Sequence, residues 1–270
     1  MNSSLVNKLR RWYRLHFGWK WYRGSYPDWS AARAASSGYD DAAILQRVVA
    51  ATREVHAGRA LWERDGALFQ TRFVNQPLLA ALAKCARLSG RLEVVDFGGS
   101  LGSTWWQHRS ELASLGLTAW RVVEQEHFVR AGHEFAGDVL SFHPNLEDAW
   151  KKGRPTVVLF SGVLQCIEEP DVILREVLRL AAPHVVMDRT PFVLRGSTRL
   201  AVQYTPPELG GGTYPCWHFR KDDLLRTLTE SYDIVEDWAG FDDVDRTIAF
   251  RGIHLLHKTG PGSLPVRAVL

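Results

Sequence analysis

The spacing of apolar residues before residue 90 is helical. Four apolar side chains recur every three or four residues in one segment: Ile44, Val48, Ala51 and Val55. Either Asp40 or Asp41 can cap this helix, and Gly58 can end it. A second helix is predicted from Pro77 to Gly90, because proline favours the first turn of a helix and glycine the position just past its end. Residues 1–90 are therefore predicted to form an all-helical cap.

Strand-like and helix-like segments alternate between residues 91 and 190. Four short runs are predicted strands: LEVVDF at 92–97, AWRVVE at 119–124, TVVLFS at 156–161 and HVVMD at 184–188. Helices are expected over 101–115 and 170–181. This alternation predicts βαβ units and a parallel sheet covered on both faces. A further helix near 221–230 precedes two strand-like segments that fit an antiparallel addition to the sheet.

The pattern predicts a Rossmann-like α/β core over residues 91–257, with a mainly parallel sheet and a terminal antiparallel strand. Residues 191–219 carry many Pro, Gly and Tyr residues without a period, so we expect a long connection over the active site. Residues 258–270 are expected to form a tail.

Composition fits one large domain, or one domain with an appendage, in 270 residues. Apolar residues make up 46% and charged residues 23%, which is ordinary for a soluble globular protein. No apolar run reaches the roughly 20 residues of a membrane span, and the start does not match a secretory signal. The cysteines are few and far apart: Cys85, Cys166 and Cys216. They predict neither a disulfide framework nor a zinc pair, and the histidines lack ligand spacing, so no metal is predicted.

The segment from residue 8 to residue 23 combines six basic residues with six aromatic ones and has no acidic residue. It could lie on an anionic membrane surface, or it could fold back and bury its aromatic side chains. We expect a cytoplasmic protein, with the inner membrane surface as the alternative location. A net charge of +3 gives no reason to expect a nucleic-acid partner. The sequence indicates no particular oligomeric state.

A glycine-rich turn, VVDFGGSLG at 94–102, follows the first strand of the alternating zone. Such a turn before a helix suits a nucleotide-type cofactor, because the helix N-terminus offers unpaired N–H groups. A dinucleotide would require glycines where Ser100 and Ser103 stand. The turn instead resembles the D-x-G-x-G-x-G pattern of class I methyltransferases at three of four positions. The four positions are Asp96, Gly98, Ser100 and Gly102, and Gly99 in the same turn is also a candidate cofactor-binding residue. An acid before the turn also suits the ammonium group of S-adenosylmethionine. An ordinary βα turn is the alternative.

Other polar residues stand at predicted strand ends. Glu124 ends the second strand and can accept hydrogen bonds from both ribose hydroxyls of a nucleoside. Asp138 is a candidate for the adenine amino group, with a turn or cap residue as the alternative. Ser161 ends the predicted strand at 156–161 and is a further candidate cofactor-binding residue.

Longer strings carry a resemblance to a known family: ERDG at 63–66, VVDFGGSLGSTWWQ at 94–107, WRVVEQ at 120–125, FSGVLQCIEEP at 160–170 and DRTPF at 188–192. The chain resembles, over about residues 19–252, a family of methyltransferases found mainly among bacterial polysaccharide and lipopolysaccharide biosynthesis proteins. The resemblance implies S-adenosylmethionine as cofactor, S-adenosylhomocysteine as product, and a sugar hydroxyl or another small molecule as acceptor.

A hydroxyl acceptor benefits from a general base. His218, in the long connection, is the first candidate, with a packed histidine as the alternative. The next candidates are Asp188, at the end of the predicted strand at 184–188, and Glu63, before a predicted turn. Two other functions stay open: a nicotinamide-dependent reductase, disfavoured by the turn, and a cofactor-binding scaffold without catalysis.

Overall fold

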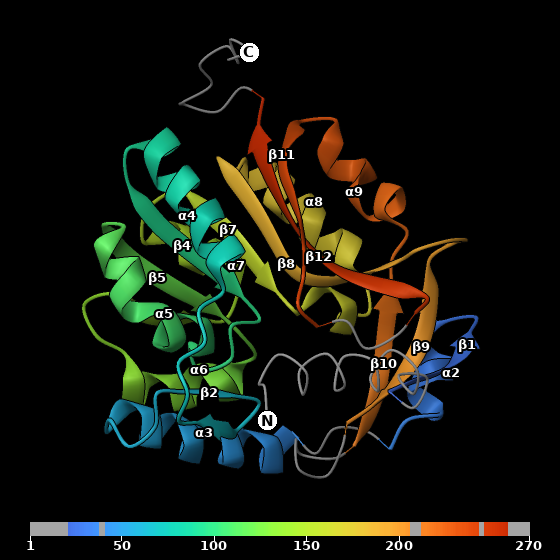
Figure 1. The fold of residues 1–270 in the computed structure, drawn as a ribbon, viewed down its shortest axis with the longest axis horizontal. Coiled ribbons are helices and arrows are strands. Elements are labelled where there is room, and N and C mark those ends of the chain that lie inside the picture. Colours follow the sequence, from blue (N-terminus) through green and yellow to red (C-terminus); the bar gives the residue numbers. More distant parts are fainter. Residues whose placement is uncertain (1–20, 38–40, 206–211, 243–245, 259–270) are drawn as a thin grey trace, which may run out of the picture.

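A computed structural model describes residues 21–37, 41–205, 212–242 and 246–258. Its centre is a sheet of seven strands in the order β6-β5-β4-β7-β8-β12-β11 (Figure 1). Their bounds are β4 (Leu92–Phe97), β5 (Leu117–Val123), β6 (Leu140–His143), β7 (Val157–Ser161), β8 (His184–Val193), β11 (Tyr232–Ala239) and β12 (Ile248–His257). Strands β4 to β8 are parallel, and β12 is antiparallel to both of its neighbours. The predicted Rossmann-like fold class is confirmed.

The chain runs outward from β4 through β5 to β6 and then returns to β7 on the other side of β4. This reversal makes the carboxyl ends of β4 and β7 a topological switch point. Ligands of open α/β folds bind in the crevice at such a point.

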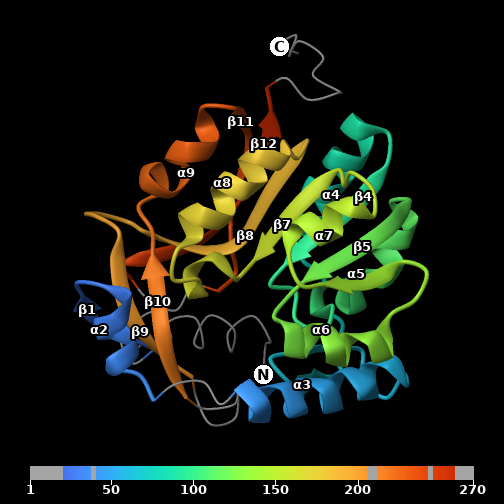
Figure 2. The same cartoon turned by 180° about the vertical axis from the view of Figure 1, so that it is seen from behind.

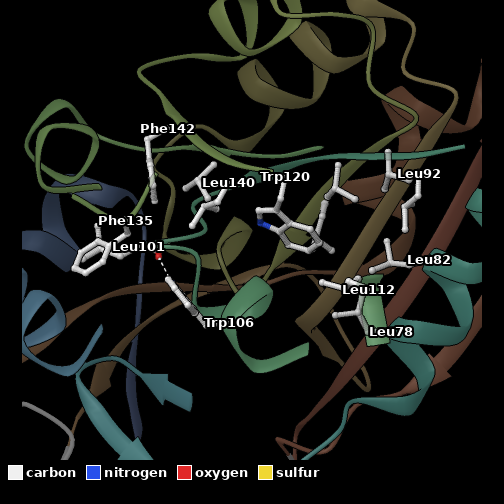
Figure 3. Packing of buried hydrophobic residues seen from close by; sticks show 14 of the residues in the cluster. Leu78, Leu82, Leu92, Leu101, Trp106, Leu112, Trp120, Phe135, Leu140 and Phe142 are labelled. Carbon is white, nitrogen blue, oxygen red and sulfur yellow. Dashed lines mark hydrogen bonds between the residues drawn. The ribbon is translucent and has the colours of Figure 1, made fainter. Parts of the chain in front are cut away.

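Helices cover both faces of the sheet (Figures 1 and 2). One face carries α3 (Asp41–His56), α4 (Gln76–Ser89), α5 (Ser103–Ser114) and α6 (Glu126–Gly132), and the other carries α7 (Leu146–Lys151), α8 (Pro170–Leu180) and α9 (Lys221–Thr229). Successive strand residues alternate between the two cores: Val94 packs in the first and Val95 in the second. Trp120 lies at the centre of the first core, among leucines from strands and helices (Figure 3).

The predicted helices near 41–58 and 77–90 are confirmed as α3 and α4, and Gly90 caps α4 with a φ of 72°. The expectation that residues 21–90 are all helical is wrong. Besides α2 (Trp29–Ala34), this region contains β1 (Tyr22–Tyr26) and the hairpin β2 (Trp62–Arg64) and β3 (Ala67–Phe69). Strands of three residues are too short to show a period, and β1 is a strand because it pairs with a distant part of the chain. The predicted domain boundaries stay predictions.

The connection over 191–219 is more ordered than its composition predicted. It forms β9 (Arg199–Tyr204) and β10 (Thr213–His218), which pair with β1 in a three-stranded antiparallel sheet. The Trp217 indole N–H donates to the carbonyl oxygen of Ile167 at 3.1 Å, in the loop that follows β7. The small sheet is therefore attached beside the carboxyl end of β7.

The basic aromatic segment 8–23 lies outside the described residues except for its last three. Tyr22 is buried with its ring edge-on to His218, and the Arg23 guanidinium lies 4.1 Å from the Tyr204 ring centre. The tail beyond residue 258 is also outside the described part. Among the described helices, none has the length and apolar composition needed to cross a membrane.

Candidate cofactor and active site

The glycine-rich turn joins β4 to α5 at the switch point. Three of its residues have positive φ angles: Gly98 at 70°, Ser100 at 56° and Gly102 at 84°. A β-carbon at Gly98 would also overlap the Val163 side chain, so this position requires glycine. Gly102 precedes α5 without a capping side chain. The turn thus leaves the helix N-terminus facing the carboxyl edge of the sheet, which is a favourable place for a polar ligand.

Glu124 is held against this turn. One carboxylate oxygen accepts a hydrogen bond from the Ser100 N–H at 3.1 Å, and the other accepts from the Gln125 N–H at 3.0 Å. The side chain is half-buried, and burial raises the pKa of its carboxyl group. The sequence prediction that Glu124 and the turn share one site therefore agrees with the geometry.

Asp96 lies beneath the turn. Its side chain is only 1% exposed, and it accepts a hydrogen bond from the Trp120 indole N–H at 3.2 Å. Burial, with the nearby charge of Glu124 adding to it, raises the pKa of Asp96 to about 8. Asp96 thus supports the turn from below, and the structure does not expose it to the cofactor's ammonium group as the sequence suggested.

Glu63 approaches the same turn from strand β2. Its carboxylate accepts hydrogen bonds from the Ser103 hydroxyl, in the first turn of α5, and from the Gly66 N–H at 3.2 Å. Burial raises its pKa to about 7. Three carboxyl groups therefore lie around this turn: those of Glu63, Asp96 and Glu124.

A second polar group lies where β7 ends beside the middle of β8. Ser161 and Asp188 are paired in register, and the Ser161 hydroxyl donates to Asp188 at 3.3 Å. The Asn75 side-chain amide also donates to Asp188, at 2.9 Å. Burial raises the pKa of the Asp188 carboxyl group. The structure therefore brings Ser161 and Asp188 together, although the strand expected to end at Asp188 continues to Val193.

A group of charged side chains, here called the charged rim, borders this edge: Arg64, Asp65, Arg189 and Asp242. The Arg189 guanidinium donates to the Asp242 carboxylate at 2.6 Å. Burial, together with the nearby positive charge of Arg189, lowers the pKa of Arg64 to about 10. Asp65 is exposed in the β2–β3 turn. The rim thus holds positive and negative groups close together.

Cys166 is exposed to solvent near this edge. Enough protein nevertheless surrounds its thiol to raise the pKa to about 12.

Two predicted residues lie elsewhere. Asp138 is exposed and precedes β6, so it lies near the amino end of that strand, whereas the cofactor edge is at the carboxyl end beyond His143. The structure therefore does not support a contact between Asp138 and adenine. His218 is fully buried, and its Nδ1 lies 2.9 Å from the Arg199 guanidinium. A nitrogen that accepts from an arginine is not available to take a proton, so the packed alternative describes His218 better.

Sequence reasoning missed Asn75, Ser103 and the charged rim's Asp242. Asn75 had a detectable signal, because it stands just before a predicted helix and caps α4 by accepting from the Leu78 N–H at 3.3 Å. The partners of Glu63 and Arg189 had no such signal, since they come from distant parts of the chain.

The fold defines a Rossmann-like α/β protein with a mainly parallel sheet and an antiparallel edge. No family model and no curated protein matches this sequence. Among solved structures, the chain is similar to the N-terminal domain of EvdMO1, solved in the presence of S-adenosylhomocysteine and D-fucose. The identity is 16% and the TM-score 0.48, over 81% of this chain and 97% of that one.

The chain is also similar to the magnesium protoporphyrin IX methyltransferase of Synechocystis PCC 6803, with bound S-adenosylhomocysteine (15% identity, TM-score 0.46, 78% of this chain and 99% of that one). A third similar structure is the 1,6-didemethyltoxoflavin-N1-methyltransferase of Burkholderia thailandensis. The identity is 15% and the TM-score 0.43, over 82% of this chain and 91% of that one. At this level of identity, cofactor and substrate have to be inferred from the residues of this chain itself.

Proposed function

We propose that this protein is a methyltransferase that uses S-adenosylmethionine and releases S-adenosylhomocysteine. The observation that carries the proposal is the Glu124 carboxylate on the Ser100 N–H of the glycine-rich turn. In a dinucleotide site, such N–H groups bind the pyrophosphate. Here the Glu124 carboxylate occupies one of them, and the buried Glu63 carboxyl group of β2 binds the Ser103 hydroxyl in the first turn of α5. Like charges would repel a pyrophosphate, whereas ribose hydroxyls and a cationic donor are attracted.

The residues around the turn have complementary roles in this proposal. Each Glu124 oxygen has a further lone pair, which can accept from a ribose hydroxyl. Glu63 is fully buried, binds the Ser103 hydroxyl and the Gly66 N–H, and so fixes the first turn of α5, which receives the amino-acid end of the donor. The donor's sulfonium already activates the methyl group, so the protein mainly aligns the methyl carbon with the acceptor oxygen for in-line displacement.

Asp188 is the proposed base. The Ser161 hydroxyl donates to Asp188, and Ser161 is half-buried at the carboxyl edge. The acceptor hydroxyl can pass its proton to the Ser161 oxygen while Ser161 passes its own to Asp188, so the acceptor oxygen gains the methyl group as the donor sulfur becomes neutral. A raised carboxyl pKa suits proton transfer near neutral pH.

The proposed acceptor is a sugar hydroxyl in a surface polysaccharide precursor. The sequence resemblance supports this class, and the charged rim offers both donors and acceptors to a polyhydroxyl compound. A small secondary metabolite is the alternative acceptor. Binding of the cofactor without methyl transfer would indicate a cofactor-binding scaffold without catalysis.

Two measurements test the proposal. Calorimetry should show binding of S-adenosylmethionine and S-adenosylhomocysteine, and far weaker binding of NAD and NADP. Tight dinucleotide binding without donor binding would contradict it. Transfer of labelled methyl to a panel of nucleotide sugars and lipid-linked sugars should then be reduced by about 10²–10⁴ in Asp188→Asn, with donor affinity retained.

A further inference from the structure

Three metal-binding side chains meet inside the protein, away from the proposed active site: Cys85, His184 and His254. Cys85 comes from α4, His184 begins β8, and His254 lies on β12. Each of the three is at most 1% exposed. Their position at the amino end of β8 is opposite to the edge that carries Asp188.

The three potential ligand atoms form a compact triangle. The Cys85 sulfur lies 3.3 Å from His254 Nε2, and His184 Nδ1 lies 3.0 Å from the same nitrogen. All three atoms are within 4.8 Å of one another. Metal–nitrogen bonds of about 2.0 Å and metal–sulfur bonds of about 2.3 Å place ligand atoms about 3.3–3.8 Å apart. A small expansion of the triangle is therefore enough to admit an ion.

Both imidazole rings also have partners on their outer nitrogens. His184 Nε2 lies 3.0 Å from the Ser89 hydroxyl. His254 Nδ1 lies 3.7 Å from the Glu236 carboxylate, whose other oxygen is bound by Lys84 at 3.0 Å. Histidines that bind metals usually have such a carboxylate or hydroxyl behind the ring, because it fixes the orientation of the ligating nitrogen.

We propose that Cys85, His184 and His254 form a structural site for a metal ion that prefers thiolate and imidazole, Zn²⁺ or Cu⁺. Binding converts the Cys85 thiol to a metal thiolate and releases one proton to solvent. With Cu⁺, one thiolate and two neutral imidazoles give a site without net charge, which suits complete burial. With Zn²⁺, one positive charge remains, and the Glu236 carboxylate behind His254 offsets it.

The site would hold α4 to the sheet. Cys85 and Ser89 lie in the C-terminal half of this helix, and Asn75, which contacts Asp188, caps its other end. Because all three ligands are buried, the ion enters as the chain folds, and its binding free energy adds to folding. The proposal is independent of the proposed methyltransferase activity.

The full-length chain is the material for the test. After unfolding, refolding with Zn²⁺ or with Cu⁺ under anaerobic reducing conditions, and gel filtration, it should retain about one ion per chain. Refolding with a chelator should give a protein with a lower melting temperature. Elemental analysis of the two loaded samples distinguishes the ions. Loss of all bound metal on gel filtration in both samples would overturn the proposal.

Cobalt provides a spectroscopic readout of the thiolate ligand. Refolding with Co²⁺ should produce the near-ultraviolet charge-transfer band of a cobalt thiolate. The band should be absent in Cys85→Ser and present in Cys216→Ser, since Cys216 is an equally buried thiol outside the triangle. If the unaltered chain shows no thiolate band, or if Cys85→Ser binds the same amount of metal as the unaltered chain, the three residues form only a hydrogen-bonded cluster.

Discussion

Single carboxyl groups decide which ligand the glycine-rich turn can hold. The turn would suit several nucleotide cofactors through its backbone alone, because N–H groups do not distinguish a phosphate from a hydroxyl oxygen. Glu124 and Glu63 add negative charge at that point. In the proposed function, the selectivity for a cationic cofactor therefore depends on Glu124 and, above its pKa of about 7, on Glu63.

Glu124→Ala tests the first of them. Hydrogen bonds to charged groups contribute about 1.5–3 kcal/mol, so we expect donor affinity to fall about tenfold or more. Calorimetric titration with S-adenosylhomocysteine measures the change. Glu126→Ala is the matched control, because the Glu126 side chain is 81% exposed on the neighbouring helix. Equal affinities in the two folded variants would remove Glu124 from the site.

Glu63 makes stability depend on pH. Burial raises its pKa from 4.5 to about 7. The folded protein then keeps a proton that the unfolded chain has released, so the free energy of unfolding falls as pH rises from about 4.5 to 7. Glu63→Gln removes this titration and should flatten the dependence, by at most about 3 kcal/mol across the window.

Urea unfolding of the unaltered protein and of Glu63→Gln, at several values between pH 5 and pH 8, measures this difference. Asp96 titrates in the same direction but is present in both proteins, so its contribution cancels. Parallel stability curves would show that Glu63 ionises normally in the folded state.

At the scale of elements, α4 connects two functional regions of the molecule. Its N-cap Asn75 serves both the helix and the site, since its oxygen accepts from Leu78 N–H and its amide donates to Asp188. Its C-terminal half carries Cys85 of the proposed metal site. A shift of α4 against the sheet would therefore affect both the surroundings of Asp188 and the proposed metal site.

Asn75→Ala should lower the free energy of unfolding by more than a cap alone contributes. Loss of a cap costs about 0.5–2 kcal/mol, and loss of one of the two side-chain hydrogen bonds to the buried Asp188 carboxyl group adds about 1–3 kcal/mol. Asn145→Ala is the control, because Asn145 caps α7 and its side chain has no partner among the site residues. Denaturant unfolding compares the two. A loss for Asn75→Ala no larger than for Asn145→Ala would separate Asn75 from Asp188.

At the scale of the whole molecule, two cores flank one sheet and a smaller sheet lies beside its carboxyl edge. The end of the basic aromatic segment belongs to the small sheet, where Tyr22 is buried and Arg23 packs on Tyr204. These last residues of the segment fold back onto the protein, and both alternatives stay open for residues 8–20, which lie outside the described part of the chain.

Removal of residues 1–20 keeps β1 intact. We expect this truncation to lower the melting temperature and to leave the cosedimentation with anionic vesicles unchanged. Vesicle binding by the full chain that falls with rising salt, and that disappears on truncation, would instead support a membrane contact through the basic residues.

The sequence by itself determined the features that depend on neighbours in the chain. The alternation of strands and helices predicted the parallel sheet, and the glycine turn with Glu124 one strand later predicted the cofactor edge. Parallel strands bring their carboxyl ends together, so residues at strand ends meet without further information. Ser161 beside Asp188 follows from the same rule.

The tertiary structure alone decided the contacts between distant segments. Asn75 and Asp188 are 113 residues apart, and Cys85 and His254 are 169 apart. No local period records such pairs, because they depend on which helix packs on which strand. The same dependence on packing enclosed His218 within the small sheet, whereas Asp138 fails as an adenine contact because β6 begins only after it, at Leu140.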